Sequence, residues 1–125
     1  VRTNRFVTKT ICYHAATMAN AISAKAISTL TNSGYTAFQI SAWRPTSHIL
    51  VFTSNRRILT QLNLLWGVKA FFYDKFVSTD DTVTDINAIA HEKGFVEKGD
   101  FLINLAAMPV MDKGMVNTLR VSQIE

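Results

Sequence analysis

The chain has 125 residues, of which 48% are hydrophobic and 18% charged, with a net charge of +4. These values fit one globular domain over residues 1–125 and exclude a disordered chain. No apolar run is long enough to span a membrane, and the first residues lack the apolar core of a signal peptide. The basic residues are dispersed, so neither nucleic acid nor a membrane is an expected partner. The single cysteine, Cys12, suits a reducing compartment, and we expect a cytoplasmic protein.

The first half of the chain alternates between predicted helices and strands. Apolar residues recur every three or four positions from Val7 to Ile22, which predicts a helix over residues 4–21. Short apolar runs further along predict buried strands, and amphipathic runs predict helices. The elements that follow are a strand over 26–30, a helix over 36–43 and a strand over 49–52. A helix capped by Ser54 or Asn55, with Ile58, Leu62 and Leu65 on its apolar face, then ends at Gly67 and precedes a strand over 68–73.

The second half continues this alternation and ends in a strand. An acidic, polar connection over residues 76–82 precedes a helix that starts at Val83 and ends at Gly94. A fourth strand covers residues 101–105, and a loop over 108–116 follows it. Residues 118–124 alternate apolar and polar side chains and predict an edge strand. Because no crossover helix precedes this strand, we expect it to run antiparallel to its neighbour.

The pattern of elements predicts an α/β fold with three layers. Five strands form a mostly parallel sheet, helices cover both faces, and the last strand is antiparallel. In such sheets ligands bind beyond the carboxyl ends of the strands, near a topological switch point. The turn after the first strand, residues 31–36, lies at such an end, and the loop over 108–116 opens from the same edge.

This turn carries the most informative sequence of the chain, Thr31-Asn32-Ser33-Gly34-Tyr35-Thr36. Hydroxyl groups, unpaired amides at a helix start and the helix dipole together form a plausible phosphate-binding site. Glycine permits a tight turn and the close approach of an oxyanion. Serine and threonine also serve as ordinary helix N-caps, so the local pattern leaves capping and anion binding open.

Other kinds of chemistry find little support in the sequence. The three histidines are widely spaced, and no Cys-x-x-Cys, His-x-x-x-His or Asp-x-Asp cluster occurs, so we expect no metal site. Walker A and Gly-x-Ser-x-Gly motifs are missing, and no catalytic residue is assigned. A phosphorelay receiver domain has a similar layout, but its acidic pair after the first strand is replaced by Thr31-Asn32, and Asp74 stands alone after the third strand.

Six motifs are spread along the whole chain: Ala24-Lys25-Ala26-Ile27, Ser33-Gly34-Tyr35-Thr36-Ala37, Arg44-Pro45, Trp66-Gly67-Val68, Lys98-Gly99-Asp100 and Asn117-Thr118-Leu119-Arg120-Val121. In their order and spacing they resemble the C-terminal domain of pyruvate kinase, and the form of the first turn is similar to bacterial members. The resemblance implies a regulatory and oligomerisation domain within a homotetramer. It also implies that the catalytic barrel, with its magnesium, potassium and phosphoenolpyruvate ligands, lies outside this chain, which alone does not transfer phosphate.

The same resemblance implies an effector site, formed by a phosphate-binding turn and an effector loop. The residues of the turn are Thr31, Asn32, Ser33, Gly34, Tyr35 and Thr36, and those of the loop are Met111, Asp112, Lys113, Gly114 and Met115. By the resemblance, Thr82 lies near the position of an arginine that binds a second phosphate in eukaryotic members. Three alternatives therefore stay open: a sugar phosphate effector, a nucleotide monophosphate effector, or a degenerate site. The alternative hypothesis is a stand-alone α/β protein that binds a phosphorylated metabolite without catalytic activity.

Overall fold

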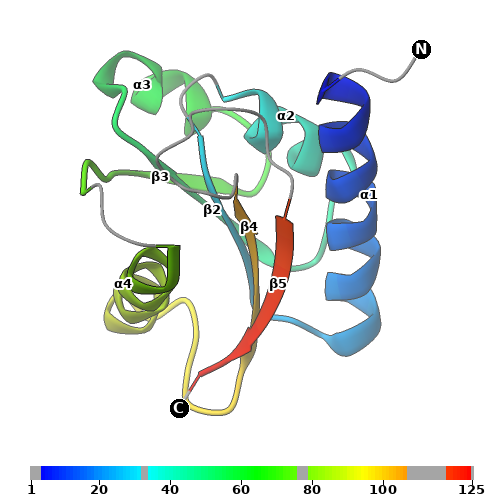
Figure 1. Ribbon diagram of the computed structural model, residues 1–125, viewed down its shortest axis with the longest axis vertical. Helices are drawn as coiled ribbons and strands as arrows, with labels where there is room; N and C mark the ends of the chain where they lie inside the picture. The colour runs from blue at the N-terminus through cyan, green and yellow to red at the C-terminus, as the bar shows by residue number, and fades with distance from the viewer. Residues whose placement is uncertain (1–3, 32–33, 76–78, 107–117, 125) are drawn as a thin grey trace.

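The computed structural model describes residues 4–31, 34–75, 79–106 and 118–124. Figure 1 shows a central twisted sheet with helices packed on its two sides. The helices are α1 (Asn4–Ile22), α2 (Tyr35–Ala42), α3 (Leu59–Leu62), which a 3-10 turn (Arg56–Ile58) precedes, and α4 (Thr79–Glu92). The strands are β1 (Ala26–Leu30), β2 (His48–Thr53), β3 (Val68–Phe72), β4 (Phe101–Ala106) and β5 (Thr118–Gln123).

The described strands form one five-stranded sheet in the order β3-β2-β1-β4-β5. β1 pairs in parallel with β2 and β4, and β2 pairs in parallel with β3, whereas β5 runs antiparallel to β4. The predicted α/β fold and the antiparallel last strand are therefore confirmed. The chain runs outward from β1 to β3 and then crosses to the other side of β1. The topological switch point consequently lies between the carboxyl ends of β1 and β4.

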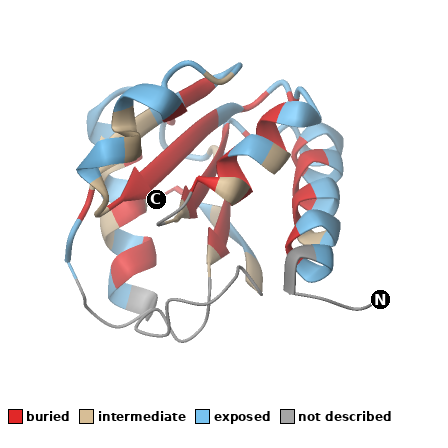
Figure 2. Ribbon diagram, turned by 90° about the horizontal axis from the view of Figure 1, so that it is seen from above, coloured by how far each residue is buried: buried red, intermediate tan, exposed pale blue. Residues whose placement is uncertain are grey.

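Each face of the sheet has its own apolar core, and Figure 2 shows the strands buried between the covering helices. α1 packs on one face through small side chains that let its backbone approach the sheet, with α2 and α3 beside it. These small side chains are Cys12, Ala15 and Ala19. α4 covers the opposite face through Ile86 and Ala90. Because successive strand residues point to opposite faces, Ile27 packs beneath α1 and Ala26 beneath α4.

The segment after β2 differs from the prediction of one helix that ends at Gly67. It forms the 3-10 turn and then a single turn of α-helix, α3. Asn63 explains the early end, because its Nδ2 donates to the Leu59 carbonyl at 3.1 Å and its Oδ1 accepts from the Ala70 amide at 3.0 Å. An asparagine side chain competes in this way with the backbone bonds that continue a helix.

The remaining helix ends agree with the predictions except at the start of α4. Asn55 caps the 3-10 turn, since its side chain accepts from the Arg57 amide. α4 begins at Thr79 instead of Val83, so the acidic pair predicted in a connection lies in the first helical turn. The positive end of the helix dipole favours acidic residues there. α4 ends before Gly94, whose φ of 82° makes the expected C-terminal turn.

Candidate functional site

The predicted phosphate-binding turn begins at the carboxyl end of β1, in the middle of the sheet. The Thr31 amide donates to the Phe52 carbonyl at 2.9 Å, which holds the chain against β2 just before it turns away. On the other side of β1, Thr29 is in register with Leu105 of β4. The carboxyl end of β4 therefore lies beside this turn, at the switch point.

Thr31 and Gly34 close the turn, and the position of Gly34 requires a glycine. The Gly34 amide donates to Thr31 Oγ1 at 3.1 Å, so one of the expected anion donors is used within the turn itself. Gly34 has a φ of +84°, and a Cβ there would lie 3.0 Å from Leu62 Cδ2 of α3. A larger residue would suffer both backbone strain and a steric clash.

α2 begins immediately after this turn, so its N-terminus lies at the switch point. Gly34 offers no side-chain cap, and its carbonyl accepts the Phe38 amide at 3.0 Å. The positive end of the α2 dipole therefore lies where an anion would approach the turn. Thr36 is only 4% exposed, and its carbonyl accepts from the Cys12 thiol at 3.8 Å. The backbone of this turn is thus tied to α1 as well as to β2.

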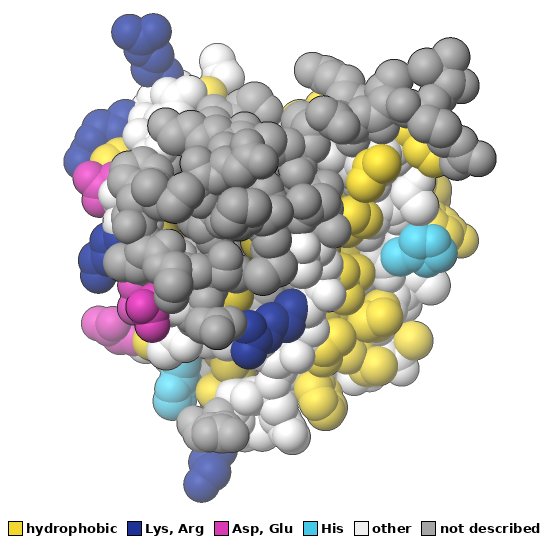
Figure 3. Space-filling model, in the orientation of Figure 1, with side chains coloured by type: hydrophobic (Ala, Val, Ile, Leu, Met, Phe, Trp, Pro, Cys, Tyr) yellow, Lys and Arg dark blue, Asp and Glu magenta, His cyan; other side chains and the backbone are white. Residues whose placement is uncertain are grey.

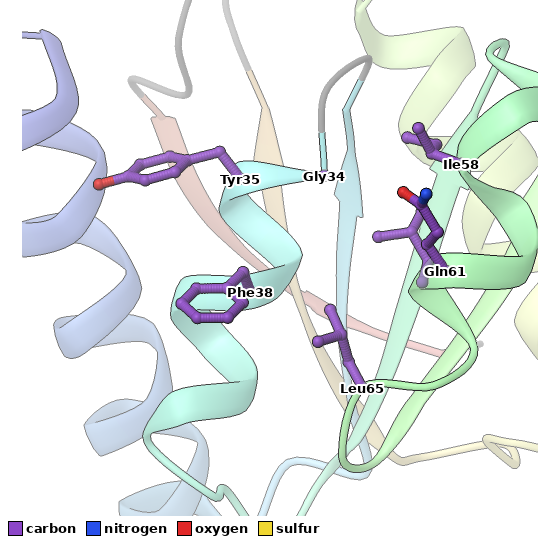
Figure 4. A pocket seen from close by; sticks show the side chains of 7 residues that line it. Gly34, Tyr35, Phe38, Ile58, Gln61 and Leu65 are labelled. Atoms are coloured by element: carbon purple, nitrogen blue, oxygen red, sulfur yellow. The ribbon is translucent and has the colours of Figure 1, made fainter.

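The described residues cover part of the predicted effector site. The turn brings together Thr31, Gly34, Tyr35 and Thr36. Outside the described residues lie Asn32, Ser33, Met111, Asp112, Lys113, Gly114 and Met115. Tyr35 is half-buried, and its ring extends toward α1 (Figure 4). The roles of all these residues in effector binding stay predictions.

A groove that sequence analysis did not anticipate opens between α2 and α3, next to the turn. It has a volume of about 370 Å³ and is lined by Phe38 of α2 and, on the other side, by Ile58, Gln61 and Leu65 (Figure 4). The sequence predicted Ile58 and Leu65 as the buried face of one continuous helix. Because that helix breaks after one turn, both side chains are only partly buried and line the groove instead.

On the opposite face of the sheet, a polar cluster joins β1, β4, β5 and α4. The Asn104 amide donates to Ser28 Oγ at 2.7 Å and to Asn87 Oδ1 at 3.2 Å. Its Oδ1 accepts from Ser122 Oγ at 2.8 Å. Asn104 and Ser28 are both buried, so these bonds satisfy groups that water does not reach. The cluster positions the two strands that border the switch point.

Three further features of the described residues bear on their function. They contain no group of three or more His, Cys, Asp or Glu side chains able to hold a metal ion. Burial raises the pKa of the Cys12 thiol to about 12, so this cysteine stays protonated and unreactive at neutral pH. Within the described ranges no helix is long and apolar enough to cross a membrane.

Comparisons with known proteins point to a single family. The family model described as the pyruvate kinase α/β domain matches residues 9–122. A pyruvate kinase from Clostridium acetobutylicum is 35% identical over 109 residues, which cover 87% of this chain and 23% of that protein. A pyruvate kinase from Lactococcus lactis is 35% identical over 119 residues, or 95% of this chain and 24% of that protein.

A solved structure agrees with the sequence comparisons. The crystal structure of a pyruvate kinase from Cryptosporidium parvum superimposes with a TM-score of 0.84 at 27% identity, over 95% of this chain and 23% of that one. The chain thus spans about a quarter of the length of the curated relatives described above. The matched family model, the identity to relatives and the shared fold together show that this chain belongs to the pyruvate kinase family and corresponds to its C-terminal α/β domain.

Proposed function

We propose that this chain is the regulatory and assembly domain of a cytoplasmic, homotetrameric pyruvate kinase of glycolysis. The whole enzyme would transfer phosphate from phosphoenolpyruvate to ADP, giving pyruvate and ATP. Magnesium, potassium and the catalytic residues would then belong to the catalytic domains, which are the first partners of this chain. The length of the relatives supports this proposal over a stand-alone binding protein, since this chain covers less than a quarter of each relative described above.

The regulatory role rests on one observation, the glycine turn that starts α2 at the switch point. Thr31 Oγ1 accepts from the Gly34 amide, which leaves the Thr31 hydroxyl proton to donate to an oxyanion. The α2 dipole adds a favourable field at the same place. A phosphorylated effector, either a sugar phosphate or a nucleotide monophosphate, would place its phosphate on residues 31–36. Residues 111–115 would fold over the rest of the effector.

A thermal shift titration of the full-length protein tests this proposal. A phosphorylated effector at about 100 times its dissociation constant stabilises the state that binds it by about 2.7 kcal/mol. Thr31→Val removes the hydroxyl proton and should abolish this response, whereas Thr31→Ser keeps the hydroxyl and should preserve it. A full response in Thr31→Val would exclude the turn as the phosphate site. The 125-residue chain by itself should give no turnover in a coupled pyruvate kinase assay.

The assembly role rests on two exposed surfaces. β5 is an edge strand that no described strand covers on its outer side, and edges of this kind pair readily with another chain. On the side of α1, hydrophobic side chains gather at the surface in Figure 3. Among the described residues of α1, the side chains of Phe6, Val7, Tyr13, Met18 and Ile22 are 36% to 43% exposed. We expect a two-fold contact between copies in which β5 takes part.

A proline on β5 tests this contact. Val121→Pro removes one backbone donor and restricts φ, so sedimentation of the full-length variant should show a weakened tetramer. Val121 is 43% exposed, which limits the direct cost of the change to the core. A folded variant that stays tetrameric with unchanged dissociation would place the interface elsewhere.

A further inference from the structure

The groove between α2 and α3 has the shape and the lining of a small-molecule site. Its volume of about 370 Å³ lies within the range of ligand pockets, which are mostly apolar with few polar groups. Phe38 of α2 is 56% exposed, so its ring is available at the surface of the groove. Ile58 and Leu65 line the other side of the groove, on the segment after β2 (Figure 4).

The chemistry of the lining selects a flat and uncharged group. Among the described residues that line the groove, none carries a charge, and Gln61 contributes the one amide side chain. An aromatic ring opposite aliphatic side chains accepts a planar ring, because stacking buries both faces of the ligand. An amide both donates and accepts hydrogen bonds, as the edge of a heteroaromatic base requires. A sugar without an aromatic ring would gain little binding energy from these apolar side chains.

The position of the groove supports the same class of ligand. Gly34 lines the groove and also closes the turn at the start of α2. The two walls follow β1 and β2, which are adjacent parallel strands, so the groove lies beside the carboxyl ends where α/β sheets bind ligands. The absence of a side chain at Gly34, where a Cβ would lie 3.0 Å from Leu62, keeps the groove continuous with the turn.

From these observations we propose that the groove binds a planar heteroaromatic ring of the size of a purine, carried by a nucleoside or nucleotide. Phe38 stacks on the ring, Ile58 and Leu65 cover its other face, and Gln61 bonds to its edge. This ring site adjoins the phosphate-binding turn through Gly34, and it rests on the proposed function only for the phosphate that a nucleotide ligand carries.

Photolabelling of the full-length protein locates the ring directly. The probe is 2-azidoadenosine, which has the ring but no phosphate, and peptide mapping after irradiation shows where it attaches. We expect labelled peptides from residues 34–38 or 58–65, and protection by excess adenosine. Phe38→Ala should reduce this labelling about fivefold or more, because stacking supplies much of the affinity for a base. Phe101→Ala is the matched control, since Phe101 is also exposed but lies on β4 outside the groove.

The outcomes separate the ring site from the effector function. Label at neither segment, or equal labelling in Phe38→Ala and wild type, overturns the ring site. If ribose 5-phosphate still stabilises the protein through Thr31 in that case, the proposed effector function stands without the ring site. If the groove is labelled and no phosphorylated compound stabilises the protein, the ring site stands and the effector function fails.

Discussion

Ser28 and Thr29 are neighbours on β1, but their hydroxyls meet opposite environments. Ser28 points to the α4 face and accepts from the buried Asn104 amide at 2.7 Å. Thr29 points to the α1 face, where its Oγ1 is buried and has no hydrogen-bond partner among the described residues. The α4 face therefore carries a satisfied polar cluster beside its apolar core, whereas the α1 face carries a buried hydroxyl without a partner among the described residues. The groove and the glycine turn both lie on the α1 face.

The largest loss of folding stability should come from breaking the polar cluster around Asn104. Asn104→Ala removes the hydrogen-bond partner that Ser28 of β1, Asn87 of α4 and Ser122 of β5 share. Leaving the buried Ser28 and the half-buried Asn87 and Ser122 unpaired should lower the free energy of unfolding by about 3 kcal/mol. Chemical denaturation measures this loss. Asn87→Ala removes one bond of the cluster and should cost less, so equal losses would contradict the central role of Asn104.

A smaller effect is expected at the glycine turn on the other face. Gly34→Ala places a Cβ at a φ of +84° and 3.0 Å from Leu62 Cδ2. Strain and repacking together should lower the free energy of unfolding by about 2 kcal/mol. Gly99→Ala is the control, since Gly99 has a φ of +92° with nothing within 4 Å of its Cβ position. Identical losses in the two variants would remove the argument for a close contact between the turn and α3.

Tyr73 provides a pH-dependent test of the α4 face. Burial, followed by the hydrogen bond to Asp85 and its charge, raises the pKa of Tyr73 from 10 to about 12. The folded state holds the phenolic proton more tightly than the unfolded state. The resulting contribution of Tyr73 to the free energy of unfolding is therefore complete below pH 10 and is lost as the pH rises through 12. Tyr73→Phe removes the 3.0 Å hydrogen bond to Asp85 and should lower the free energy of unfolding by about 1 kcal/mol at pH 7. The variant should also lose less stability than wild type as the pH rises above 10. An equal loss of stability at alkaline pH in both proteins would show that other groups cause it.

Removal of the unpartnered hydroxyl should have the smallest effect and the opposite sign. Thr29→Val keeps the shape of the side chain and replaces a buried, unsatisfied oxygen with a methyl group. Because burial of an unpaired hydroxyl is unfavourable, the variant should be more stable by about 1 kcal/mol. Ser28→Ala, its neighbour on the other face, should be less stable than wild type. A loss of stability in Thr29→Val would indicate a partner for this hydroxyl.

The sequence predicted the fold well because its strongest patterns are local. Short apolar runs identified β1 to β4, alternation identified β5, and the missing crossover helix predicted that β5 is antiparallel. The break after α3 was not predictable, because it depends on Asn63 reaching the Ala70 amide of the next strand. The same break exposes the groove, so a site between α2 and α3 was invisible to periodicity. The turn at Gly34 was recognisable from its residue types, but its contact with Leu62 is tertiary.

The Asn104 cluster was missed for a related reason. Its four members come from β1, α4, β4 and β5, and only the sheet order β1-β4-β5 brings them together. A polar residue inside an apolar strand, as Asn104 is within β4, was the available signal. Such a residue usually finds a partner when it is buried, and its position in the strand gives the face on which to look for one.

The most direct test of the account is a steady-state assay of the full-length protein with and without effectors. Phosphoenolpyruvate is varied at fixed ADP, and sugar phosphates and nucleotide monophosphates are added in turn to wild type, Thr31→Ser and Thr31→Val. The account predicts pyruvate kinase activity whose KM for phosphoenolpyruvate shifts with at least one phosphorylated effector in wild type and Thr31→Ser, and no shift in Thr31→Val. A shift of equal size in Thr31→Val, or none in wild type with any effector, would contradict a regulatory site at this turn.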